Sequence, residues 1–210
     1  NNKIIVGTAQ FVKNYGIDNK NCDYMNKFKL LDEIYKLKCH GIDTAFNYEN
    51  AHKTIGLWLK KNRNNIKIYT KLPSINKNDN LDSILKNCFK NLNLKKIEGL
   101  FLHNQNDWQK KEVQLFASKL LEKQLIKYFG LSIYDTKAIP NHPIIRILQV
   151  PGSIFNQEIL TSNELNLYLE SGGEVHIRSV FVQGLILMKI KSIPSSFNEL
   201  IKPLKLFHNI

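Results

Sequence analysis

Four polar side chains that could together transfer a proton stand near the ends of apolar, strand-like runs: Asp43, Tyr48, Lys71 and His103. A tyrosine with its ordinary pKa near 10 is a poor acid at pH 7 unless a nearby cation lowers that pKa. Lys71 could be this cation, Asp43 could hold it charged and in place, and His103 could donate a hydrogen bond to a substrate oxygen. Such a phenol suits the protonation of an alkoxide that forms when a carbonyl group is reduced.

These side chains can meet only if successive strands run parallel and present their C-terminal ends at one rim. Strand-like apolar runs occur at residues 4–8, 41–45, 66–70, 99–102, 127–131, 144–150 and 174–180. Most gaps between them hold an amphipathic stripe with helical spacing, most clearly over residues 81–92, for which Asp79 is the predicted N-cap. A last helix is predicted from Ser195 to about His208. Strand and helix alternating in this way predict βαβ units and a parallel sheet.

Two parallel architectures remain open at this point. An open, doubly wound sheet should carry a glycine-rich phosphate loop after its first strand, but the first run continues as Gly7-Thr8-Ala9-Gln10, without such a motif. Polar residues at the ends of several successive strands favour a TIM-type (β/α)8 barrel instead. Seven strands can be counted rather than eight. We therefore predict an α/β fold, a single barrel domain over residues 1–210 that lacks its eighth βα repeat.

Composition excludes several other classes. With 43% hydrophobic residues the chain should be globular, and no run approaches the roughly 18 apolar residues of a membrane span. The net charge is +12, but the lysines are spread along the chain, and only Arg63, Arg146 and Arg178 could make fork-like phosphate contacts, so we predict no nucleic-acid binding. A basic surface would still attract an anionic cofactor or substrate. The three widely spaced cysteines predict reduced thiols in a cytoplasmic protein, and the histidines show no metal-ligand spacing.

Recognisable motifs follow one another along nearly the whole chain: Val6-Gly7-Thr8-Ala9-Gln10, Gly41-Ile42-Asp43-Thr44-Ala45-x-x-Tyr48 with Ile55-Gly56, Thr70-Lys71, Leu102-His103, Phe129-Gly130-Leu131-Ser132, Leu148-Gln149-Val150 and Arg178-Ser179-x-Phe181-x-Gln183-Gly184. In residues, order and spacing they resemble the aldo/keto reductase family. The resemblance implies a (β/α)8 barrel that uses NADPH, with Asp43, Tyr48, Lys71 and His103 as the catalytic tetrad.

The resemblance also implies eight positions in contact with NADPH: Gly7, Thr8, Ser132, Gln149, Arg178, Ser179, Phe181 and Gly184. Gly7 and Thr8 would lie beside the nicotinamide ribose, while Ser132 and Gln149 would bind the carboxamide. The last four positions match the stretch along the pyrophosphate, where a guanidinium and exposed backbone N–H groups suit an anion.

Some positions depart from the family pattern. Ile133 stands where many relatives have Asn, Arg178 where many have a tyrosine beneath the nicotinamide ring, and His52 where a glutamate is usual. We predict His52 to be a surface helix residue and Trp108 to be a packing residue, although Trp108 could line a substrate pocket. Arg178 could contact pyrophosphate or form a buried ion pair. After Ser195 nothing matches the expected eighth strand and the loop that holds the adenosine phosphate.

The function predicted from the sequence is therefore an oxidoreductase that reduces an aldehyde or ketone to an alcohol by hydride transfer from NADPH. The alternative is a non-catalytic or regulatory aldo/keto reductase-like protein, which the missing eighth repeat favours. The expected partner is a small carbonyl compound, and a homo-oligomer could form through the open barrel edges. A longer natural chain, a naturally short one or a partner chain would each account for the missing repeat. The sequence does not identify the substrate.

Overall fold

A computed structural model describes residues 3–13, 15–17, 24–62 and 65–209. Its strands are β1 (Ile5–Gly7), β2 (Gly41–Asp43), β3 (Lys67–Leu72), β4 (Ile97–Leu102), β5 (Ile126–Ser132), β6 (Ile145–Pro151) and β7 (Glu174–Arg178). Its α-helices are α1 (Tyr24–Lys36), α2 (Ala51–Asn62), α3 (Leu81–Leu92), α4 (Lys111–Glu122), α5 (Asn163–Glu170) and α6 (Ile201–His208). The short 3₁₀ helices are η1 (Ala9–Phe11), η2 (Gln105–Gln109), η3 (Thr136–Ala138), η4 (Ile159–Thr161), η5 (Val182–Leu187), η6 (Ile190–Ser192) and η7 (Ser195–Leu200).

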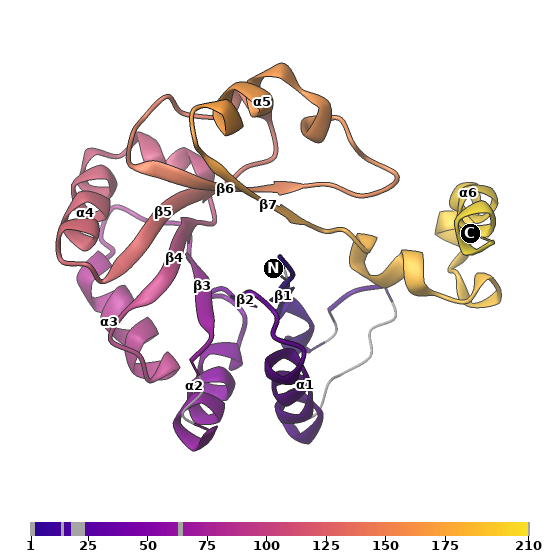
Figure 1. Cartoon of the computed structure of the whole chain (residues 1–210), viewed down its shortest axis with the longest axis horizontal. Coiled ribbons are helices and arrows are strands. Elements are labelled where there is room, and N and C mark those ends of the chain that lie inside the picture. Colours follow the sequence, from indigo (N-terminus) through magenta and orange to yellow (C-terminus); the bar gives the residue numbers. More distant parts are fainter. Residues whose placement is uncertain (1–2, 14, 18–23, 63–64, 210) are drawn as a thin grey trace.

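The strands form one parallel sheet in which spatial order follows chain order from β1 to β7. The sheet curls, and α1 to α5 lie on its outer side (Figure 1). A doubly wound sheet would reverse its strand order, so this arrangement confirms the barrel-type alternative. In the part of the chain that the structure describes, β1 and β7 are not paired with each other, and the predicted seven-stranded, incomplete barrel is confirmed.

The main core lies between the outer face of the sheet and the helices. Leu31 of α1, Ile55 of α2 and Leu92 of α3 are fully buried in it, as the helical spacing of the apolar residues predicts. A side chain at Gly56 would place its Cβ 2.0 Å from the carbonyl oxygen of Asn91. Glycine is therefore required where α2 meets the end of α3, and this contact fixes how closely the two helices pack.

A smaller cluster fills the inside of the curled sheet. Tyr69, Phe101 and Ile147 pack together there, and the ring of His176 meets the first two edge-on, with ring centres 4.9 and 5.7 Å apart. Side chains two residues apart on a strand point to the same face. The inside of the curl therefore also receives Lys71, Gln149 and Arg178, each two positions after one of Tyr69, Ile147 and His176. These three side chains point into its open, C-terminal end.

Two predictions about helix ends were wrong. Asn80, not Asp79, caps α3, because its side chain accepts a hydrogen bond from Ser83 N at 2.9 Å. The single helix predicted from Ser195 to His208 is instead η7 followed by α6, with a kink at Phe197. Proline has no N–H to donate and is tolerated only in the first turn of a helix, which fits the start of α6 just before Pro203.

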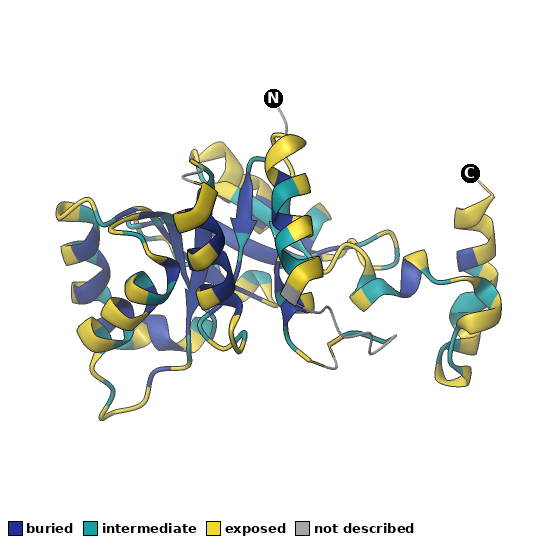
Figure 2. Cartoon of the chain, turned by 90° about the horizontal axis from the view of Figure 1, so that it is seen from below, coloured by how far each residue is buried: buried dark blue, intermediate teal, exposed yellow. Residues whose placement is uncertain are grey.

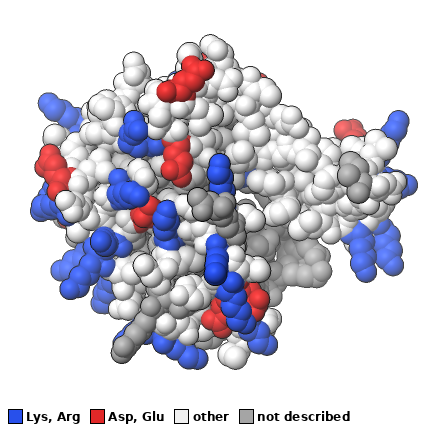
Figure 3. All heavy atoms as spheres, viewed as in Figure 1, with Lys and Arg blue, Asp and Glu red and all other residues white. Residues whose placement is uncertain are grey.

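The segment from η5 to α6 extends away from the curled sheet (Figures 1 and 2). Leu185, Ile186 and Leu204 form a small apolar cluster of their own within it. Lysine and arginine side chains are scattered over the face in Figure 3 and do not gather into one stripe. None of the described helices is long and apolar enough to cross a membrane. Cys39 and Cys88 are free, while Cys22 lies outside the described residues.

Candidate active site

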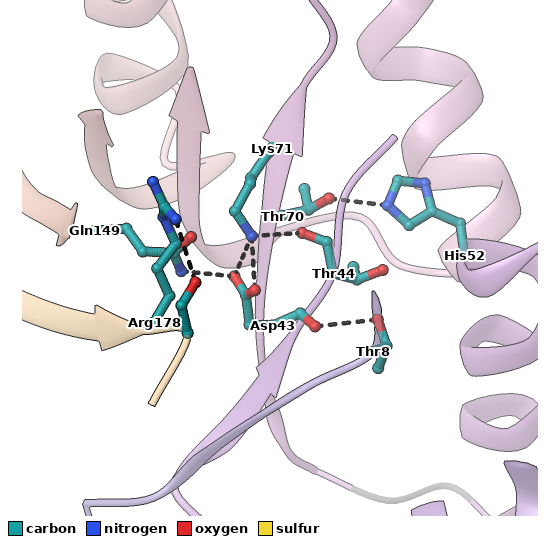
Figure 4. Close-up of polar contacts among 9 residues, drawn as sticks. Thr8, Asp43, Thr44, His52, Thr70, Lys71, Gln149 and Arg178 are labelled. Atoms are coloured by element: carbon teal, nitrogen blue, oxygen red, sulfur yellow. Dashed lines mark hydrogen bonds and ion pairs between the residues drawn. The ribbon is translucent and has the colours of Figure 1, made fainter. Parts of the chain in front are cut away.

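A buried ion pair stands at the C-terminal ends of β2 and β3. Lys71 Nζ lies 2.7 Å from Oδ1 and 2.6 Å from Oδ2 of Asp43, with exposed side-chain fractions of 2% and 14% (Figure 4). Lys71 also donates to the carbonyl of Thr44 at 3.2 Å, and Gln149 Nε2 donates to Asp43 Oδ1 at 3.1 Å. Buried charges need such partners, because desolvation otherwise outweighs the attraction between them.

Tyr48 lies beside this pair. A turn after β2 carries it, with Tyr48 N bonded to the carbonyl of Ala45 at 3.1 Å, and the Tyr48 ring centre is 5.7 Å from Lys71 Nζ. Burial, and then the charge of Asp43, raise the pKa of Tyr48 above its ordinary value, although Arg178 acts in the opposite direction. The predicted lowering was therefore wrong, because desolvation of the phenol and the charge of Asp43 outweigh the opposing charge of Arg178. At neutral pH the phenol stays protonated, which is the form that can donate a proton.

His103 follows the last residue of β4 and is half-buried. Burial lowers its pKa, and the charges of Lys71 and Arg178 lower it further, with Asp43 opposing. The ring is therefore neutral near pH 7 and lies within electrostatic reach of the ion pair. Among the described contacts, Asp43 and Lys71 bond directly and Tyr48 adjoins them, whereas His103 makes no hydrogen bond to the other three.

Four of the positions predicted to contact the cofactor border the ion pair. Gly7 pairs in register with Asp43, and Thr8 bonds the Asp43 carbonyl through its N–H at 2.9 Å and its hydroxyl at 3.0 Å. Ser132 and Gln149 are register partners on β5 and β6, and both are buried. Because a carboxylate only accepts hydrogen bonds, the amide nitrogen of Gln149 must face Asp43. Its Oε1 then points elsewhere, and it is buried without a partner.

Arg178 ends β7 and reaches across β6 toward β5. Its Nη2 lies 3.4 Å from the carbonyl oxygen of Ile133, and its guanidinium stacks on Tyr134 at 4.1 Å from the ring centre. Arg178 Nε is buried without a partner. None of the described carboxylates forms an ion pair with Arg178, so the buried ion pair was the wrong alternative. Tyr134 was missed in the sequence, where an exposed tyrosine in a loop gives no signal.

The three remaining positions lie in a tight turn after β7. Ser179 has a φ of 61°, and Gly184 has a φ of 95°. Val182 between them also has a positive φ, 49°, which is strained for a β-branched residue. Phe181 is exposed at the start of η5. Backbone strain of this kind concentrates at functional sites, because other contacts must hold the conformation.

The structure contradicts the prediction that His52 is a surface helix residue. It is 4% exposed, and its Nε2 lies 2.8 Å from Thr70 Oγ1, next to Lys71 in the sequence (Figure 4). Burial lowers the pKa of His52 to about 4. The sequence held a signal for this position, because His52 falls on the same helical stripe as Ile55 and Leu59, which are buried in α2.

The buried His52 predicts acid sensitivity. Above pH 6.5 the ring is neutral in both states, but between pH 6.5 and about 4 the unfolded chain binds a proton that the folded chain does not. Wild type should lose up to about 3 kcal/mol of unfolding free energy over this window through His52. His52→Gln should lose less. Urea unfolding at pH 7.5, 5.5 and 4.5 checks this, with the exposed His208→Gln as the control, and equal losses in wild type and His52→Gln would contradict it.

Comparisons with known proteins agree with this geometry. Residues 3–186 match a sequence model of the aldo/keto reductase family. An aldo-keto reductase from Bacillus halodurans in its holo form has 20% sequence identity and a TM-score of 0.77, over 99% of this chain and 72% of that chain. An aldo-keto reductase from Klebsiella pneumoniae in complex with NADPH has 17% identity and a TM-score of 0.70, over 88% and 68%.

A further structure from Klebsiella pneumoniae, described as an aldo/keto reductase in complex with NADP and acetate, has 16% identity and a TM-score of 0.69, over 95% of this chain and 72% of that chain. No curated protein matched the sequence. At these identities the structural likeness supports the fold, and the family match, which spans most of the chain, supports membership. This chain belongs to the aldo/keto reductase family.

Proposed function

We propose that this chain reduces an aldehyde or ketone to the alcohol, with NADPH as the hydride donor. The observation that carries the proposal is the buried Lys71–Asp43 ion pair beside the protonated phenol of Tyr48, at the C-terminal ends of parallel strands. Strand ends of this kind are where barrel enzymes hold their catalytic side chains. The descriptions of two similar structures as complexes with NADPH and NADP support the choice of cofactor.

In this proposal Tyr48 donates its proton to the carbonyl oxygen as negative charge develops there. His103 is neutral near pH 7 and donates one N–H to the same oxygen, which orients the carbonyl. Lys71 stabilises the phenolate that the transfer leaves behind, and Asp43 holds Lys71 charged and in position. NADPH supplies the hydride when it is bound.

The residues present fit a nicotinamide cofactor. The unpartnered Oε1 of Gln149 can accept a hydrogen bond from a carboxamide NH₂, and the unpartnered Nε of Arg178 offers a donor nearby. Added Cβ atoms at Gly7 and Gly184 would meet no atom within 4 Å, so there is open space at both positions. We propose that Thr8 and Ser132 complete the nicotinamide end, and that the turn with Ser179 and Phe181 carries the pyrophosphate, where backbone N–H groups suit an anion.

Two measurements test the proposal. NADPH binding can be followed through the change in its fluorescence on titration with the protein, and turnover through NADPH absorbance with a small panel of aldehydes and ketones. We expect saturable binding and carbonyl-dependent oxidation of NADPH. Saturable binding without turnover would favour the regulatory alternative. Absence of both would reject the proposal.

Gln149 allows a separate prediction about the cofactor. Gln149→Leu removes the acceptor proposed for the carboxamide and also the donor to Asp43, so NADPH affinity should fall about 10-fold, the worth of one lost hydrogen bond with its buried partner. Fluorescence titration measures the change. Gln114→Leu is the matched control, because Gln114 lies on α4 and donates to the carbonyl of Trp108, outside the proposed site. Equal affinity in wild type and Gln149→Leu would remove Gln149 from the cofactor site.

A further inference from the structure

A second ion pair, with a buried carboxylate and a partly exposed lysine, lies just beyond His103, in the short helix η2 and its C-cap. Asp107 is 3% exposed, and its Oδ1 lies 2.6 Å from Lys110 Nζ. Its other oxygen, Oδ2, accepts a hydrogen bond from Ile75 N at 2.9 Å, and Lys110 Nζ also donates to the carbonyl of Ile75. The side chains of Asp107 and Lys110 thus bind both main-chain polar groups of Ile75, its N–H and its carbonyl, and Ile75 lies in another loop.

Ile75 and Asp107 belong to neighbouring loops that carry proposed catalytic groups. Ile75 lies four residues after Lys71, in the loop that follows β3, and Asp107 lies four residues after His103, in the loop that follows β4. At the start of η2, Asp107 N also donates a hydrogen bond to the carbonyl of Asn104 at 3.2 Å. The ion pair therefore joins the end of one catalytic strand to the end of the next.

The same short helix also contacts a third loop. Gln105 Oε1 accepts a hydrogen bond from Tyr134 N at 3.1 Å, in the loop that follows β5. The ring of Tyr134 stacks on Arg178 at the end of β7. A continuous set of contacts therefore runs along the rim from the loop after β3 to the end of β7, and η2 lies in the middle of it.

We propose that Asp107 and Lys110 are positioning residues, which hold the backbone that carries His103 in place by clamping the η2 segment to the main chain of Ile75. This inference rests on the proposed function, because it assigns the clamp to the same carbonyl site. The His103 side chain has no hydrogen bond to Asp43, Tyr48 or Lys71 in the described contacts, so its place depends on the backbone that carries it. The clamp restrains that backbone through a charged pair whose carboxylate is buried.

The first test uses Asp107→Asn, which keeps the shape of the side chain and removes the charge that holds Lys110. We expect kcat/KM for a carbonyl substrate to fall between about 10- and 100-fold, because small displacements of an orienting group have effects of this size. NADPH affinity should stay within about twofold, because no proposed cofactor contact is touched. Asp82→Asn is the matched control, because its ion pair with Lys119 is exposed, with N–O separation of 3.3 Å.

The second test measures the pKa of His103 by NMR of its ring protons in the apo protein. A loss of stability alone would not change this pKa in the folded protein. In wild type we expect a pKa below the ordinary 6.5, and in folded Asp107→Asn a pKa that returns toward 6.5 as the ring is released to solvent. An unchanged His103 titration together with an unchanged kcat/KM, in a variant whose circular dichroism matches wild type, would overturn the inference.

Lys110→Met covers the case in which Asp107→Asn does not fold, since Asp107 then keeps its bond to Ile75 N, while the cation and its bond to the Ile75 carbonyl are lost. The same two quantities are measured, and an unchanged kcat/KM together with an unchanged His103 titration would again reject the clamp. If wild type reduces no carbonyl compound, the proposed function fails. The NMR titration still decides whether the clamp holds His103 in place, so the two failures can be told apart.

Discussion

Tyr48→Phe is expected to lower kcat for carbonyl reduction by about 10²- to 10⁴-fold, the usual contribution of a positioned general acid. The phenylalanine ring keeps the contact with Lys71, whose Nζ is 5.7 Å from the ring centre, but has no proton to give. The raised pKa of Tyr48 keeps the wild-type phenol protonated, so the proton is available across the neutral range. NADPH affinity should change by less than about twofold, because the substitution removes an interaction made in the transition state.

NADPH oxidation and NADPH fluorescence, measured on the same preparations, separate these two effects. Tyr35→Phe serves as the control, because Tyr35 lies on α1 with its ring against Trp58 and is not one of the candidate site residues. It should match wild type in both assays. Equal turnover by wild type and Tyr48→Phe would remove Tyr48 from the acid role, whatever the affinity for NADPH.

The strands were predictable from the sequence because a parallel sheet covered by helices gives continuous apolar runs. Each predicted run overlaps its observed strand with end shifts of at most two residues, as at β3 (Lys67–Leu72) against the predicted 66–70. Helix ends were less certain, because several residue types can serve there. Asp79 and Asn80 are both suitable N-caps, and only the backbone geometry decides that Asn80 accepts from Ser83 N.

The pairing of Asp43 with Lys71 was predictable from the sequence, whereas the energetics of the candidate site were not. Strand ends and spacing identify Asp43 and Lys71 as neighbours, and the structure bonds them directly. The direction of the Tyr48 pKa depends on how desolvation compares with nearby charges, and a sequence contains neither quantity. Asp107 escaped notice for a similar reason. Its partner Ile75 contributes only main-chain groups, which no sequence pattern can mark.

Lys71→Met should destabilise the protein by about 3 to 5 kcal/mol at pH 7, because it leaves the Asp43 carboxylate largely buried without its cation. Carbonyl reduction should also fall by at least about 100-fold, because the phenolate of Tyr48 would lose its stabilising charge. Urea unfolding at pH 7, together with the turnover assay, measures both effects.

The double variant Lys71→Met/Asp43→Asn distinguishes the two roles of the pair. Removing the stranded carboxylate should recover much of the lost stability, because a neutral amide costs far less to bury than an unpaired charge. It should not recover turnover, since the cation beside Tyr48 is still missing. Lys119→Met, which breaks the exposed pair with Asp82, should stay within about 0.5 kcal/mol of wild type. Unchanged stability in Lys71→Met would contradict the prediction, and it would mean that Asp43 is solvated or paired without Lys71. The hydrogen bond from Gln149 Nε2 to Asp43 would then be the first contact to examine.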